Sequence, residues 1–122
     1  MPKKVLIVDD TSLMRVAIGK VVRELDATAV DAVDGEEAVR LYDETRPDLV
    51  IMDVTMPKKD GVTAIREILA INPAAVIHVL SALKHKEIVD KCLAAGAKSH
   101  LPKPLDKTLL KKMLASELGE KI

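Results

Sequence analysis

The feature that most limits what this chain can fold into is a regular alternation of short apolar runs with segments of helical periodicity. Five runs that are nearly all apolar, each too short for a helix, predict strands at residues 5–8, 28–33, 49–52, 76–80 and 99–101. After each run, apolar residues recur at intervals of three and four, which is typical of helices. Such strands occur in parallel sheets that helices cover on both faces. The sequence therefore predicts a three-layer α/β fold of five strands and five helices, in one domain over residues 1–122.

Composition excludes several classes of protein. The chain has 122 residues, 48% hydrophobic and 31% charged, a balance typical of a folded globular domain rather than a disordered segment. Tyr42 is the only aromatic residue, so a stacking platform for single-stranded nucleic acid is missing. The single cysteine, Cys92, excludes an internal disulfide and a cysteine-based zinc site. No apolar run reaches 18 residues and the N-terminus leads directly into a strand, so we expect a cytoplasmic protein without membrane association.

Local signals mark the ends of the predicted elements. Thr11 is of the residue type that caps a helix start, and Asp34 with Glu37 resembles a capping box. Gly96 is placed to follow the end of the fourth helix. Pro102 is acceptable in the fifth strand only if that strand lies at the edge of the sheet.

Reactive side chains follow four of the five predicted strands, namely Asp9 with Asp10, then Asp53, Ser81 and Lys103. Because the carboxyl ends of parallel strands share one edge of a sheet, we expect these side chains to converge. Three neighbouring carboxylates repel one another unless a cation lies between them, and oxygen ligands favour Mg²⁺ over zinc. A lysine and a hydroxyl at the same edge would supply positive charge and hydrogen bonds to a phosphoryl group.

Each of these residues has a plainer interpretation when it is taken alone. An acid at a strand end often only caps a helix, a serine often lies in a turn, and a lysine between two prolines is often an exposed loop residue. The coincidence of all of them at the ends of different strands favours a functional site.

The motifs as a set resemble those of a response-regulator receiver domain, over essentially the whole chain. The resemblance rests on Val8-Asp9-Asp10, Met52-Asp53-Val54-Thr55-Met56-Pro57 followed by Asp60-Gly61, Leu80-Ser81-Ala82, Gly96-Ala97 and Lys103-Pro104. It implies a flavodoxin-like, doubly wound sheet with the strand order 2-1-3-4-5.

The same resemblance implies a role for each site residue. Asp53 would accept a phosphoryl group from a sensor histidine kinase or a small phosphodonor, and would later lose it to water without acting as an enzyme on a separate substrate. Ser81 would hydrogen-bond the phosphoryl oxygens, Lys103 would pair with them, and the Lys103–Pro104 peptide bond would be cis. The Mg²⁺ ligands would be Asp9, Asp10, Asp53 and the backbone carbonyl of Thr55.

His100 departs from the family pattern. Receiver domains usually have Tyr or Phe three residues before the lysine, as a ring that moves when the hydroxyl residue moves toward the phosphate. The imidazole of His100 is smaller, more polar and titrates near neutrality. Two interpretations stay open: a half-exposed strand residue without a switching role, or a switch residue that also makes the output surface sensitive to pH.

Charge is unevenly divided along the chain. Residues 1–60 carry 13 acidic and 9 basic side chains, whereas residues 61–122 carry 6 acidic and 10 basic ones. This suggests a cation site in the first half and an interaction surface in the second, although two ordinary solvated surfaces would explain the division equally well. As an output surface, the basic second half would suit an acidic protein partner rather than DNA. The basic residues expected on that surface are Lys84, His85, Lys86, Lys91, Lys98, Lys107, Lys111 and Lys112.

We expect a stand-alone receiver domain, either a diffusible chemotaxis-type signal to a motor or switch protein or an intermediate that passes phosphate to a histidine phosphotransfer protein. Two alternatives come from other classes. A phosphatase of the haloacid dehalogenase type needs a second Asp two residues after the first, where this chain has Thr55. A flavodoxin-like cofactor-binding protein needs a phosphate-cradling loop, which this sequence lacks.

Overall fold

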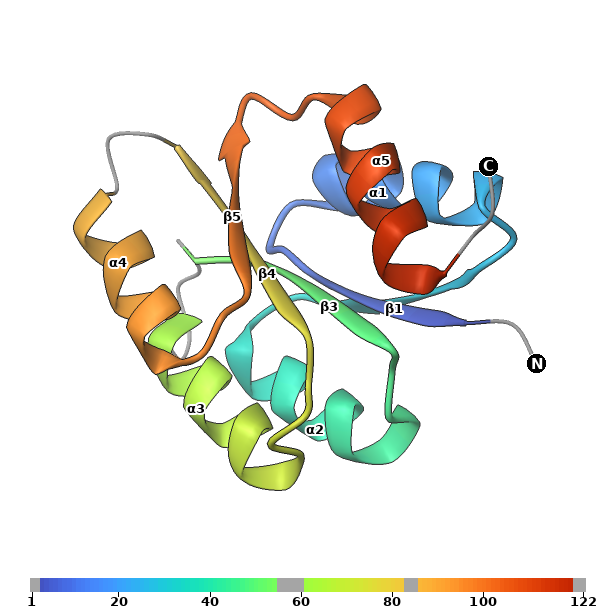
Figure 1. The fold of residues 1–122 in the computed structure, drawn as a ribbon. Helices are drawn as coiled ribbons and strands as arrows, with labels where there is room; N and C mark the ends of the chain where they lie inside the picture. Colours follow the sequence, from blue (N-terminus) through green and yellow to red (C-terminus); the bar gives the residue numbers. More distant parts are fainter. Residues whose placement is uncertain (1–2, 55–60, 83–85, 120–122) are drawn as a thin grey trace.

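The protein folds around a five-stranded parallel sheet with the order β2-β1-β3-β4-β5 (Figure 1). The computed structural model describes residues 3–54, 61–82 and 86–119. Its strands are β1 (Lys4–Val8), β2 (Thr28–Ala32), β3 (Leu49–Asp53), β4 (Ile77–Ala82) and β5 (Ser99–Lys103). The strand order and the parallel pairing confirm the fold predicted from the sequence.

Helices cover both faces of the sheet, in the three-layer arrangement that the alternating sequence predicts. In Figure 1, α1 and α5 lie on one side of the strands and α2, α3 and α4 on the other. The helices are α1 (Ser12–Glu24), α2 (Gly35–Thr45), α3 (Gly61–Ile71), α4 (Lys86–Ala95) and α5 (Lys107–Leu118). Each helix in the described part of the chain is too short or too polar to cross a membrane.

The central strand β3 shows why the strands are nearly all apolar. Its five residues are all buried, because successive side chains point to opposite faces and both faces are covered. Val50 and Met52 pack into the core beneath α2, α3 and α4, whereas Leu49 and Ile51 pack into the core beneath α1 and α5. Asp53 is the last residue of this strand and the first that is not apolar.

The strands β4 and β5 extend two residues past their predicted ends. The ladder between β4 and β5 continues through the pairs Ser81 with Pro102 and Ala82 with Lys103, beyond the predicted ends at residues 80 and 101. Proline is tolerated there because β5 lies at the edge of the sheet, as expected. Ser81 and Lys103 therefore belong to strands, which hold their backbones more rigidly than loops would.

The predicted helix ends are confirmed with one exception. Asp34 Oδ1 accepts a hydrogen bond from the Glu37 N–H at 2.9 Å, while Glu37 Oε1 accepts one from the Val33 N–H at 3.2 Å. Gly96 follows α4 with φ 122°, a left-handed conformation that favours glycine. Thr11 does occupy the position before α1, but its side chain makes no capping hydrogen bond. Its hydroxyl donates a hydrogen bond to Asp9 Oδ1 instead, at 2.8 Å.

His78 is a buried polar residue on β4, away from the strand ends that carry the reactive side chains. Its side chain is 3% exposed, and its Nδ1 lies within hydrogen-bonding distance of Ser99 Oγ. Its Nε2 lies 3.7 Å from Glu117 Oε1, which also accepts a hydrogen bond from Lys98 Nζ at 2.6 Å. Burial lowers the pKa of His78 below its ordinary value of 6.5, and the Lys98 charge adds to this, whereas Glu117 opposes it.

The lowered pKa of His78 predicts a loss of stability in mild acid. The unfolded chain takes up a proton at His78 near pH 6.5, and the folded protein does so only at lower pH, so this contribution to stability is present above 6.5 and lost below it. We expect the free energy of unfolding to fall less steeply for His78→Leu than for the wild type between about pH 7.5 and about pH 5. Urea denaturation across this range measures both slopes, and parallel slopes would contradict the assignment.

Candidate functional site

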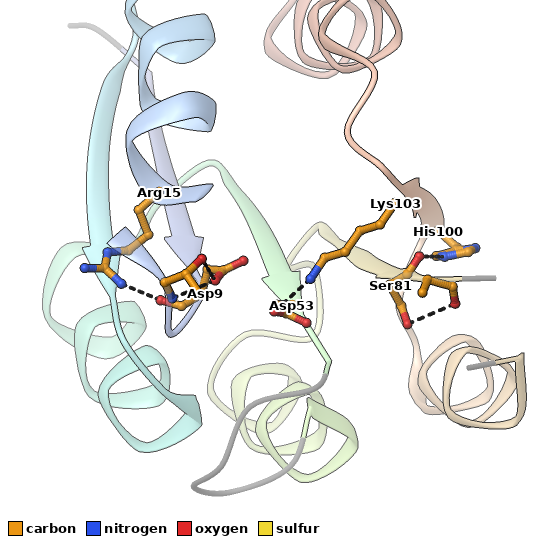
Figure 2. A network of polar contacts seen from close by, with 8 residues as sticks. Asp9, Arg15, Asp53, Ser81, His100 and Lys103 are labelled. Carbon is orange, nitrogen blue, oxygen red and sulfur yellow. Dashed lines mark hydrogen bonds and ion pairs between the residues drawn. The ribbon is translucent and has the colours of Figure 1, made fainter. Parts of the chain in front are cut away.

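The side chains that the sequence places at strand ends gather at one edge of the sheet (Figure 2). Asp9 directly follows β1, Asp53 ends β3 and Lys103 ends β5. Carboxylate oxygens of Asp9, Asp10 and Asp53 all lie within 4.8 Å of one another. The predicted convergence of these acids, from positions more than forty residues apart, is therefore present in the fold.

Asp9 is held in an unusual electrostatic position. It is 1% exposed, and its Oδ1 accepts hydrogen bonds from both the N–H and the hydroxyl of Thr11, each at 2.8 Å. Its Oδ2 is buried without a hydrogen-bond partner in the described structure. Burial raises the pKa of the Asp9 carboxyl and the Asp53 charge adds to this, whereas the Thr11 hydrogen bonds and the Lys103 charge lower it. A buried carboxylate oxygen without a partner is costly, and a cation ligand would remove that cost.

Asp53 forms an ion pair that crosses one intervening strand. Lys103 extends from β5 over β4, and its Nζ lies 3.1 Å from Asp53 Oδ2. The Asp53 side chain is 3% exposed and that of Lys103 is 28% exposed. The pair thus combines a nearly buried carboxylate with a cation that solvent still reaches, and the lysine offsets part of the repulsion among the three acids.

Ser81 and His100 lie beside each other on the neighbouring strands β4 and β5 (Figure 2). Ser81 is fully buried, and its hydroxyl donates to the Ala82 carbonyl oxygen at 3.4 Å. His100 is half-buried, and its Nε2 lies 3.1 Å from the Ser81 carbonyl oxygen. Because a carbonyl only accepts, His100 Nε2 carries the proton in this contact. The imidazole is therefore bonded to the backbone of the strand that carries the serine hydroxyl.

Two site contacts were not predicted from the sequence. Arg15, in the first turns of α1, donates from Nη1 to the Asp9 carbonyl oxygen at 2.6 Å, and Thr11 bonds the Asp9 carboxylate. The sequence signal for Thr11 is a hydroxyl two residues after an acid, the spacing of a local turn. Among the predicted site residues, Thr55 lies outside the described residues. The Lys103–Pro104 bond is cis, as the resemblance implied.

Comparison with known families identifies the family to which this fold belongs. The model of the response regulator receiver domain matches residues 5–115. The chain belongs to this family.

Curated relatives of this receiver domain cover most of its length. Protein CcdB of Bacillus subtilis is 39% identical over 117 residues, which are 95% of this chain and 98% of CcdB. Chemotaxis protein CheY of Treponema pallidum is 42% identical over 123 residues, which are 96% of this chain and 83% of that protein.

Solved structures agree with these relatives. The receiver domain of the sensor histidine kinase PA1611 from Pseudomonas aeruginosa has a magnesium ion coordinated in its active site cleft. It matches with a TM-score of 0.87 and 30% identity, over 98% of this chain and 100% of that one. A chain of the CheX–CheY–BeF3–Mg complex from Borrelia burgdorferi matches with a TM-score of 0.87 and 35% identity, over 95% and 89% of the two chains.

These matches assign the receiver domain to two-component signal transduction, with chemotaxis regulators among its relatives. They do not favour the two alternatives from other classes, the haloacid dehalogenase-type phosphatase and the flavodoxin-like cofactor-binding protein.

Gly61 lets the receiver domain bring α3 close to the chain that follows β3. A Cβ at this position would lie 2.9 Å from Val54 Cγ1 and 3.2 Å from Val54 Cα, closer than carbon atoms pack. Val54 directly follows Asp53 in the chain. The glycine of the Asp60-Gly61 motif is therefore explained by packing, because it lets α3 begin against the backbone of Val54, next to Asp53.

Replacing Gly61 with alanine should destabilise the receiver domain by about 1–3 kcal/mol, because the added methyl group displaces Val54. Gly19→Ala in α1 is the matched control. There the Cβ would first meet the flexible guanidinium end of Arg23, at 3.2 Å, and a helix interior favours alanine over glycine by roughly 1 kcal/mol. Urea denaturation measures both variants. A Gly61→Ala protein as stable as the wild type would refute the packing role.

Proposed function

We propose that this receiver domain accepts a phosphoryl group on Asp53 from the phosphohistidine of a sensor kinase, and that it acts as a stand-alone cytoplasmic response regulator formed by residues 1–122. The observation that carries the proposal is the cluster of three carboxylates within 4.8 Å of one another, with Lys103 Nζ 3.1 Å from Asp53 Oδ2. Such a cluster is electrostatically unfavourable without a cation, and it has the charge and the oxygen ligands that phosphoryl transfer requires.

The residues at this edge of the sheet fit a magnesium ion. Asp9, Asp10 and Asp53 would hold it, together with the backbone carbonyl of Thr55, and the unpaired Asp9 Oδ2 supports this assignment. A bound Mg²⁺ would neutralise the negative charge that the carboxylates and the phosphoryl oxygens bring together. The match to a receiver domain that coordinates magnesium also supports it.

In the proposed reaction, a carboxylate oxygen of Asp53 attacks the phosphorus atom in line with the leaving imidazole. The new O–P bond forms while the P–N bond of the phosphohistidine breaks, and the imidazole nitrogen leaves with the electron pair. Lys103 is already paired with Asp53, and its ammonium group would then form an ion pair with a phosphoryl oxygen. Hydrolysis of the acyl phosphate by water would then reset the domain, which makes it a phospho-acceptor rather than an enzyme for a separate substrate.

Ser81 and His100 would carry the signal away from Asp53. The Ser81 hydroxyl is bonded to the Ala82 carbonyl oxygen, so it would have to rotate to reach a phosphoryl group. His100 contacts the Ser81 carbonyl oxygen at 3.1 Å. A rearrangement of Ser81 would therefore change the environment of an imidazole on the edge strand, which supports the switch interpretation of His100.

The output surface would be formed by α4, β5 and α5 and would bind a protein partner. Two lysines predicted for it are already paired within the domain, Lys98 with Glu117 at 2.6 Å and Lys111 with Glu24 at 3.4 Å. The positive charge available to a partner is thus smaller than the composition indicates, and Lys84 and His85 lie outside the described residues. A chemotaxis-type target is favoured by the CheY relatives, and a histidine phosphotransfer protein is the alternative.

Incubation with acetyl phosphate and Mg²⁺ tests the proposed acceptor. We expect a mass gain of one phosphoryl group, which disappears when EDTA removes the metal. Asp53→Ala should abolish the gain because it removes the attacking oxygen, whereas Asp43→Ala, at an exposed acid on α2, should leave it unchanged. Labelling that persists in Asp53→Ala would exclude Asp53 as the acceptor.

His100→Phe tests the switch interpretation. We expect beryllofluoride to change the affinity for the output partner by a different factor in His100→Phe than in the wild type, because a phenyl ring cannot donate a hydrogen bond to the Ser81 carbonyl oxygen. An equal response in both proteins would reduce His100 to a strand residue without a switching role.

A further inference from the structure

Asp9 is restrained at every polar atom except one. Its N–H donates to the Ala32 carbonyl oxygen at 3.0 Å, and its own carbonyl oxygen accepts from Arg15 Nη1 at 2.6 Å. Thr11 donates two hydrogen bonds to Oδ1. The remaining atom, Oδ2, is the buried oxygen without a hydrogen-bond partner in the described structure. Fixing all the others fixes the position of this one.

The Arg15 side chain is itself fixed, because it contacts both β2 and the residue that follows β1. Its guanidinium Nε lies 3.7 Å from Asp31 Oδ2 on β2, while Nη1 reaches the backbone just beyond β1. The side chain is 16% exposed, so the contact with the Asp9 carbonyl is largely shielded from water. A guanidinium has several donors in a rigid plane and serves both partners at once, which the point charge of a lysine does less well.

We propose that Arg15, Thr11 and Asp31 form a clamp on Asp9, and that this Asp9 clamp presents Oδ2 to the cation in a fixed position. The inference rests on the proposed magnesium site. Arg15 and Thr11 are positioning residues, since they contact Asp9 and act through it. The clamp would matter most for Mg²⁺, which demands near-ideal octahedral geometry, and less for the larger Ca²⁺, which accepts irregular ligand sets.

Because Arg15 is positively charged, a positioning role and a purely electrostatic effect predict opposite changes in cation affinity when it is replaced. Arg15→Met removes a positive charge that contacts Asp9, one of the three acids, and by Coulomb attraction alone this would tighten cation binding. A positioning role predicts the opposite, because the freed Asp9 backbone no longer fixes Oδ2. Loss of a residue that orients a metal ligand weakens metal binding by about 10- to 100-fold.

Calorimetric titration of the full chain with MgCl₂ and, separately, CaCl₂ tests the clamp. We expect Arg15→Met to raise the dissociation constant for Mg²⁺ on the order of tenfold and that for Ca²⁺ by less, with Arg15→Lys in between. Thr11→Val removes one hydrogen bond without changing the charge and should act in the same direction. Arg40→Met is the control, because it removes an equal charge from an exposed ion pair on α2.

Each result decides the matter. Tighter or unchanged Mg²⁺ binding in Arg15→Met, or an equal loss for both cations, would overturn the clamp. Should Arg15→Met fail to fold, by urea denaturation, the same criteria apply to Thr11→Val. If the wild type binds no Mg²⁺, the proposed phosphoryl-acceptor function fails and the clamp fails with it. If the wild type binds Mg²⁺ and the variants bind it equally well, only the clamp proposal is overturned.

Discussion

The main physical constraint on this domain is the mutual repulsion of the Asp9, Asp10 and Asp53 carboxylates, which the fold brings together at one edge of the sheet. Both faces of the sheet are covered by helices, and the central strand β3 is apolar up to its last residue, Asp53. Asp9 and Asp53 are nearly buried there, and Lys103 compensates only part of their charge. In the proposed function, the uncompensated remainder would give the site its affinity for a cation, and hence its ability to receive a negatively charged phosphoryl group.

The contacts that keep these acids together despite their repulsion come from elements far apart in the chain. Lys103 reaches Asp53 across β4, Arg15 restrains Asp9 from α1, and Gly61 lets α3 begin against Val54. These three contacts differ in kind, being an ion pair, a charged hydrogen bond to the backbone and a close approach without a side chain. Together they keep the acids near one another although the charges oppose it.

Much of this was predictable from the sequence, for a physical reason. Because parallel strands end at a common edge, apolar runs that stop at Asp9, Asp53 and Ser81 place those residues together without any knowledge of side-chain contacts. The contacts themselves were not predictable in the same way. Thr11 is of the residue type that caps a helix, and Arg15 is of a type common on protein surfaces. Only the folded structure shows that both side chains reach Asp9. His78 lies within an apolar run, where periodicity predicts burial but gives no partner such as Ser99.

Pro102 has a consequence for how other molecules meet this domain. A proline in an edge strand has no backbone donor to offer, and the side of β5 away from β4 is where a further strand would have to pair. Continuous extension of the sheet by a peptide from another protein is therefore blocked at that residue. The edge that lies nearest the proposed switch is closed to strand addition, and recognition there must be carried by side chains.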